Sequence, residues 1–247
     1  MRTMSHPTRH AQLLRRTAAL ATTAVLLGAC ADSEAGAPPS PSGKPSVPSC
    51  VTSSGDLSAD IDGDGRTDRV SDPSRTGARL TVAFGGKAGY GKPVGVRKLV
   101  GDSGGGEKDV VGAVADFDGD GWSDLAVVAT GQKQGDDAIR PKVAKLVSGP
   151  FSASGRGQRT RKLDLVETRG VSVADYNHDS HPDLAVFSYN GDGVYQTEAR
   201  LGSEGTGLTD ASADSAGYTR SVYASIPIKL PPSGLGKFYP KCGKTDG

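Results

Sequence analysis

One short acidic pattern occurs three times in this chain of 247 residues, and it constrains the fold more than any other feature. The three copies begin at Asp60, Asp116 and Asp175 and read DIDGDGRTD, DFDGDGWSD and DYNHDSHPD. Their first residues are 56 and 59 residues apart. Repetition at a nearly constant period of this length indicates stacked or radially arranged copies of one supersecondary unit.

Each copy carries the residue types of a calcium-binding loop. Positions 1, 3 and 5 direct oxygen-bearing side chains at one centre, glycine at position 6 permits a sharp turn, and position 9 returns another carboxylate. Ca²⁺ takes six to eight hard oxygen ligands, and carboxylates crowded into one short loop repel one another unless a cation lies between them. An ordinary solvated turn would explain one copy, but three copies in phase favour Ca²⁺ as the cofactor. Its role stays open between structural support and a direct part in function.

The loops join strand to strand and are therefore not EF-hands. An EF-hand ends on a bidentate Glu at position 12, which here is Ser71, Val127 or Val186. The runs 125–129 and 184–188, which follow the second and third loops, are short and rich in β-branched residues, as are the runs before these loops. Such runs predict buried strands. The equivalent segment of the first unit, 69–72, is polar, which predicts a frayed or edge strand.

Strand, Asp-rich loop and strand at this period resemble the FG-GAP and VCBS repeat family, as in the propeller of integrin α-subunits. The motif that names the family has a counterpart in Phe84-Gly85-Gly86, and Gly149-Pro150 and Leu201-Gly202 occupy similar places in the next two units. The resemblance covers roughly residues 55–202. It implies an all-β fold, either a small β-propeller or an open stack of three to four four-stranded blades, with a calcium loop between the first two strands of each blade.

The resemblance also implies a set of metal ligands in each loop. The third loop departs from the pattern, because it has Asn177 where the others have Asp and Ser180 where they have Gly. We expect it to contain a strained turn and to bind calcium most weakly. The implied ligands are Asp60, Asp62, Asp64 and Asp68; Asp116, Asp118, Asp120 and Asp124; and Asp175, Asn177, Asp179 and Asp183.

The first fifty residues predict export and a membrane anchor. A basic stretch that ends at Arg15-Arg16 precedes an apolar run that is too short to span a bilayer, as in a signal peptide. The run closes with Leu27-Gly28-Ala29-Cys30, which resembles the bacterial lipobox, whose cysteine receives a diacylglyceryl group. We expect a lipoprotein signal peptide over 1–29, a disordered Pro/Ser-rich tether over 30–49 and the propeller domain over 50–247. Sec and twin-arginine export both stay open, as does an ordinary signal peptide with Cys30 incidental.

Cys50 and Cys242 lie at the two ends of the predicted domain. Exported domains fold in an oxidising compartment, where cysteines pair. We therefore expect a Cys50–Cys242 disulfide that ties the ends of the domain together.

Composition and the remaining motifs favour a binding module over an enzyme. Without residues 1–29, 25 basic residues stand against 28 acidic ones, a net charge of −3 that leaves no basic field for nucleic acid. The stretch 101–105 matches a serine protease signature around Ser103, but the mature chain has no histidine before it, and His178 and His181 lie inside the third loop. We expect a lipid-anchored binding or scaffold module on the outer face of the cell membrane, with a protein or glycan partner. The alternative is a lyase or hydrolase for surface polysaccharide on the same scaffold.

Overall fold

The computed structural model describes residues 43–103, 106–131, 135–209, 220–223, 230 and 234–243. The predicted signal peptide, Cys30 and most of the predicted tether lie outside these residues. The chain divides into two compact units, and the second, 34–247, contains every described residue. Among the described residues, no helix has the length and apolar character needed to cross a bilayer.

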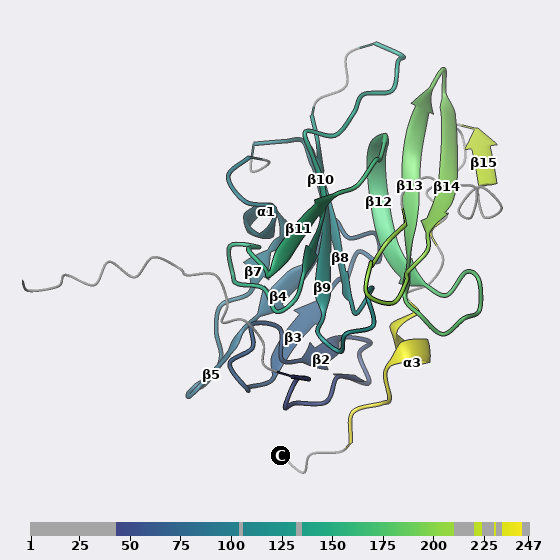
Figure 1. Ribbon diagram of the computed structural model, residues 1–247. Helices are drawn as coiled ribbons and strands as arrows, with labels where there is room; N and C mark the ends of the chain where they lie inside the picture. The colour runs from purple at the N-terminus through teal and green to yellow at the C-terminus, as the bar shows by residue number, and fades with distance from the viewer. Residues whose placement is uncertain are drawn as a thin grey trace, which may run out of the picture. The chain divides into compact units, whose positions relative to one another are not determined.

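Strands of this second unit form three antiparallel sheets and a small ribbon (Figure 1). The first sheet has the order β1 (Cys50–Val51), β2 (Leu57–Ala59), β3 (Asp68–Ser71), β4 (Thr81–Ala83) and β7 (Val94–Gly95). The ribbon pairs β5 (Gly85–Gly86) with β6 (Gly89–Tyr90). The second sheet has the order β11 (Arg159–Lys162), β10 (Val143–Ser148), β9 (Asp124–Thr130) and β8 (Asp109–Ala115). The third has the order β12 (Glu167–Ala174), β13 (Asp183–Gly191), β14 (Val194–Arg200) and β15 (Arg220–Tyr223).

Each sheet corresponds to one repeat of the sequence, and we call it a blade. The three acidic loops join β2 to β3, β8 to β9 and β12 to β13, which are the connections that the family resemblance implies. The prediction of an all-β fold built from antiparallel blades is therefore confirmed, and the second and third blades have the expected four strands, whereas the first has five. One detail of it is wrong: β3 is not at an edge but pairs with both β2 and β4. Its polar composition misled because only Asp68 and Val70 of this strand are buried.

The second blade is buried on both faces because it lies between the other two. Along β8, Val110 and Val114 belong to one hydrophobic core, which they share with the first blade. Val111, Ala113 and Ala115 alternate with them and belong to the core shared with the third blade. A strand with two buried faces reads as a continuous apolar run, which explains the sequence of β8 and β9.

The C-terminal segment returns to the first strand of the domain. It contains the short helix α3 (Leu235–Phe238), which follows β15 in the described chain, whereas α1 (Val96–Leu99) belongs to the first blade. Val51 N–H donates to Pro240 O over 2.8 Å, and Cys242 N–H donates to Val51 O over 2.9 Å. A disulfide joins Cys50 to Cys242, as the sequence predicts.

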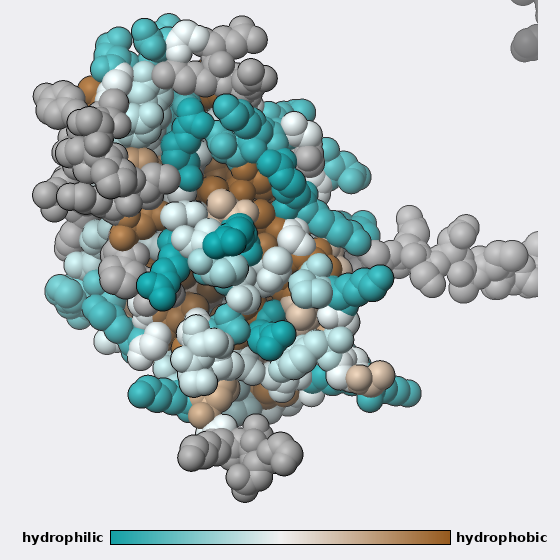
Figure 2. Space-filling model, turned by 180° about the vertical axis from the view of Figure 1, so that it is seen from behind, coloured by the Kyte–Doolittle hydropathy of each residue, from teal (hydrophilic) through white to brown (hydrophobic). Residues whose placement is uncertain are grey.

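The inner strands β8 and β12 lie side by side and border a cavity of about 680 Å³. Segments of all three blades and of α3 line this cavity. On the face of the molecule opposite to that of Figure 1, Figure 2 shows hydrophobic residues recessed between hydrophilic side chains. The repeats therefore surround a shared internal space, which the sequence did not locate.

Candidate metal centres

The three acidic loops have the same backbone shape. In each, the residues at positions 4 and 6 adopt a left-handed conformation, with φ of 79° and 79° in the first loop and 71° and 96° in the second, all at glycines. In the third loop these positions are His178, with φ 61°, and Ser180, with φ 70°. A side chain in this conformation costs roughly 1–2 kcal/mol. The strained turn predicted at Ser180 is confirmed, and His178 adds a second strained residue that the sequence analysis did not identify.

Aspartate at position 9 fixes each loop to the rest of its blade. Both carboxylate oxygens of Asp124 accept backbone hydrogen bonds, from Phe117 N–H at 2.9 Å and from Gly149 N–H at 2.9 Å. Asp68 and Asp183 accept the equivalent bonds in their own blades, at 2.5–2.8 Å. All three aspartates are fully buried. One donor comes from position 2 of the loop and the other from the glycine of the family motif, so this residue links the loop to the end of the third strand.

The motif glycines are required by this close contact. A Cβ atom on Gly149 would lie 2.3 Å from the carbonyl oxygen of Ser123, the residue before Asp124. At Gly85 and Gly202 the equivalent distances, to Thr67 O and Pro182 O, are 2.3 and 2.2 Å. Only glycine lets the chain pass close enough to donate its N–H to the buried carboxylate. The three motifs that the sequence analysis aligned are therefore structurally equivalent.

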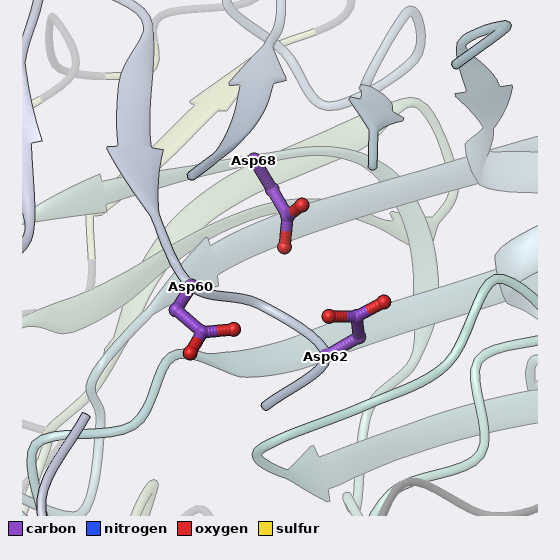
Figure 3. Close-up of side chains that lie close together, drawn as sticks. All are labelled: Asp60, Asp62 and Asp68. Atoms are coloured by element: carbon purple, nitrogen blue, oxygen red, sulfur yellow. The ribbon is translucent and has the colours of Figure 1, made fainter. Parts of the chain in front are cut away.

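Carboxylates gather in the first and second loops. One oxygen from each of Asp60, Asp62 and Asp68 lies within 4.8 Å of the others, and Figure 3 shows these side chains directed at the same space. Asp116, Asp118 and Asp120 form a second such group. In the described part of the third loop no three acidic side chains meet this distance. Asp179 there accepts a 2.7 Å hydrogen bond from the Asn177 amide instead.

Burial dominates the electrostatics of the carboxylates in these loops. Desolvation is the largest cause that raises the pKa of Asp68 to about 7, of Asp116 to about 6 and of Asp124 to about 8, and neighbouring aspartates raise each further. Oδ1 of Asp116 and Oδ1 of Asp175 are buried and have no hydrogen-bond partner. Both oxygens belong to position 1 of their loops. A cation at the loop centre would offset this desolvation and satisfy the orphaned oxygens, so the residues present fit a hard divalent ion.

The first loop uses its acidic groups differently. Both oxygens of Asp60 already accept backbone bonds, from Gly63 N–H at 2.8 Å and Gly65 N–H at 3.0 Å. The carboxylate of Asp64 pairs with the guanidinium of Arg66. The second loop has no such ion pair among its described contacts, and its Asp118 is 5% exposed. It is therefore the strongest of the three candidate centres.

Each blade covers the loop of the blade before it. Phe151 N–H donates to the carbonyl of Ile61, at position 2 of the first loop, over 2.8 Å. Ser203 N–H makes the equivalent 3.2 Å bond to Phe117 of the second loop. Trp122 is 7% exposed and packs between blades, since a Cβ on Gly63 of the first loop would lie 3.9 Å from its ring. The loops thus form a row in which neighbours touch.

Two further contacts of the loops could not be seen in the sequence. Trp122 Nε1–H donates to Gly43 O over 3.0 Å, so the described end of the predicted tether, 43–49, contacts the second loop. Asp116 N–H donates to Oη of Tyr239 over 2.8 Å. Tyr239 lies 123 residues away, and the sole sequence signal for its position is its closeness to Cys242, whose disulfide brings the C-terminal segment to the start of the domain.

Residues 168–207 match the family model of the FG-GAP repeat. The match runs from β12 through the third acidic loop to the turn after β14. It supports the resemblance at the one repeat whose loop departs most from the pattern. No curated protein and no solved structure matches the chain.

Proposed function

We propose that this protein is a lipid-anchored, extracytoplasmic binding module whose FG-GAP-type blades are stabilised by calcium. The FG-GAP match and the antiparallel blades support a binding module of the β-propeller type. The anchor at Cys30, the calcium ions and the cell-surface location extend that statement. A protein or glycan at the cell surface is the partner in this proposal.

The orphaned Oδ1 of Asp116 carries the calcium part of the proposal. An unpaired buried carboxylate oxygen is costly, and here two more aspartates share its site. The ligands would be the side chains at positions 1, 3, 5 and 9 of each loop. When bound, the ion would supply positive charge to the loop, and the position-9 aspartates would hold the loop in shape through their two backbone bonds.

Thermal unfolding of the mature chain with excess Ca²⁺ and with EDTA tests this assignment. Binding to the native state alone stabilises by about 2.7 kcal/mol per site at a hundredfold excess over Kd. For a domain of this size that corresponds to a rise in Tm of roughly 5–10 °C. Asp118→Ala should remove much of the rise, whereas Asp102→Ala, at an exposed acid outside the loops, should leave it intact. A Tm that is the same in calcium and in EDTA would contradict the proposal.

The anchor is tested separately. Two or more acyl chains hold a protein on a bilayer because each buried methylene contributes about 0.8 kcal/mol. We expect the exported protein to sediment with membranes and Cys30→Ser to appear in the soluble exported fraction. Cys30→Ser should fold as the native chain does, because Cys30 is no part of the Cys50–Cys242 bridge. Membrane retention of Cys30→Ser would show that the cysteine is not the anchor.

The cavity lining favours binding over the alternative of a polysaccharide lyase or hydrolase. Such an enzyme needs acid and base groups that converge on the bound sugar. Of the described residues that line the cavity, Arg75 alone comes from the set of His, Tyr, Arg and Glu. The carboxylates of Asp56 and Asp72 accept hydrogen bonds within their own turns. These contacts give each carboxylate a structural role.

A further inference from the structure

The central cavity lies between the free edges of two strands. β8 is an edge strand of the second blade, and β12 is an edge strand of the third. Gly112 and Val114 on β8 and Val171 and Val173 on β12 all line the cavity. Its volume of about 680 Å³ is of the size that small-ligand sites have, ~300–1,000 Å³.

One backbone donor of β8 faces the cavity and has no partner among the described residues. Gly112 N–H donates to Gly77 O over 3.1 Å and so points away from β9. N–H directions alternate along an antiparallel strand, so those of Val114 and Asp116 point the same way. Asp116 N–H is bound by Tyr239. No described residue accepts the Val114 N–H or donates to the carbonyls of Gly112 and Val114.

The edge of β12 repeats this arrangement. Val171 N–H donates to Thr76 O over 2.9 Å, and Val173 O accepts from Gly234 N–H over 2.7 Å. Both residues therefore direct their backbone groups away from β13. Among the described residues, none pairs with Val173 N–H or with Val171 O. Within the described part of the chain, the edges of β8 and β12 thus leave backbone donors and acceptors without partners along the same stretch of the cavity.

Backbone segments of the protein itself already pair with β8 and β12 at the two ends of the cavity. The loop 72–77 supplies Thr76 O and Gly77 O at one end, and it is held in shape by Gly77 N–H, which donates to Asp72 over 2.7 Å. The C-terminal segment supplies Gly234 N–H at the other end. The space between them is therefore bounded by groups that pair with a main chain.

A positively charged side chain, that of Arg75, lies at the same cavity. Arg75, at the tip of the loop 72–77, is exposed and lines the cavity. Its φ of 56° is left-handed, a strained conformation of the kind that is found at binding sites. No described residue forms an ion pair or hydrogen bond with its guanidinium. The group is free to bind a carboxylate.

We propose that this cavity binds a short peptide in extended conformation, whose backbone pairs with Val114 and Val173 and whose carboxylate binds Arg75. The distance from Gly112 to Asp116 along β8 accommodates about three to four residues at ~3.4 Å each. Main-chain pairing with an open sheet edge is an established mode of peptide recognition. The inference rests on the proposed function as a binding module, for which it names the partner class, but it does not depend on calcium.

Amide NMR of the mature chain, titrated with an equimolar mixture of tetrapeptides with free termini, tests the site. We expect chemical-shift changes and slowed hydrogen exchange to concentrate at the amides of Val114 and Val173. The same mixture with N-methylated backbones should produce neither effect, because methylation removes the peptide donors. Arg75→Gln should weaken binding at least tenfold, and tetrapeptide amides should lose affinity for the native chain by a similar factor.

A variant that fills the cavity provides the matched control. Gly236 lines the cavity, and a Cβ there meets nothing within 4 Å, so Gly236→Trp should fold and block the peptide-induced shifts. Gly106→Trp, at an exposed glycine with equally open surroundings, should leave them intact. Absent shifts, shifts elsewhere, or equal shifts with N-methylated peptides or with a tetrasaccharide would overturn the proposal. If calcium raises Tm and peptides do not bind, only this inference fails. If peptides bind and calcium has no effect, only the calcium proposal fails.

Discussion

The second and third acidic loops share a backbone shape but reach it by different means. In the second loop both left-handed positions are glycines, and Asp118 brings a third carboxylate close to those of Asp116 and Asp120. In the third loop His178 and Ser180 adopt the same conformation against their preference, and an amide replaces one carboxylate. The shape is therefore imposed by the surroundings, chiefly by the two backbone bonds to the aspartate at position 9, and the glycines lower the cost of adopting it.

The second and third loops also differ in their position along the row of blades. The second loop is covered by the next blade, which donates a hydrogen bond to its Phe117 carbonyl. The third loop belongs to the last of the three described blades. Repeat proteins commonly tolerate departures from their pattern in terminal repeats, because these lack one neighbour. The weaker pattern of the third loop is consistent with its place as the last of the three.

The largest expected effect concerns the motif glycine, whose N–H donates to the position-9 aspartate in both loops. Gly149→Ala should lower the free energy of unfolding by about 3 kcal/mol, because its Cβ would lie 2.3 Å from a backbone carbonyl that cannot move cheaply. Gly202→Ala should cost the same to within about 1 kcal/mol. Chemical denaturation measures both, with Gly95→Ala, in open surroundings, as the control. A much smaller cost at Gly202 would show that the third loop is not anchored as the second is.

An intermediate effect concerns the pH dependence of stability in the absence of divalent cations. The pKa values of Asp68, about 7, and Asp124, about 8, are raised in the folded protein, so the folded state holds protons that the unfolded chain, with pKa near 3.9, releases. Stability from these groups is present at low pH and is lost as pH rises through 7 to 8, by up to about 1.4 kcal/mol per group and pH unit. In EDTA, Tm should therefore be higher at pH 6 than at pH 8.

Excess calcium is the control for this pH effect. In the calcium proposal a cation takes the place of the protons, so the higher Tm expected at pH 6 should disappear or reverse. If Tm in EDTA rose with pH instead of falling, the raised pKa values of the position-9 aspartates would be wrong.

The smallest expected effect comes from a substitution that makes the third loop more like the second. Ser180→Gly should stabilise the protein by about 0.5–1 kcal/mol, because it removes the left-handed strain but adds chain entropy to the unfolded state. Thermal unfolding detects this as a rise in Tm of a few degrees. Gly121→Ser, the reverse change in the second loop, should lower Tm. Destabilisation by Ser180→Gly would mean that the serine side chain contributes a contact that outweighs its strain.

Features that repeat along the chain could be predicted from the sequence, and those that join distant segments could not. The spacing of Asp60, Asp116 and Asp175 predicted the loops and the strands on either side of them. The redox environment predicted the Cys50–Cys242 bridge. The interior position of β3, the contact of Tyr239 with the second loop and the free edges around the cavity depend on which segments meet after folding. Neither periodicity nor composition carries that information.

The Cys50–Cys242 disulfide also determines how the domain responds to mechanical force. From Cys50 the covalent bridge continues directly to Cys242. A pull between the two ends of the chain therefore passes through the bridge and bypasses residues 51–241. The three blades lie outside the load path, so tension along the chain cannot peel them apart while the bridge is intact.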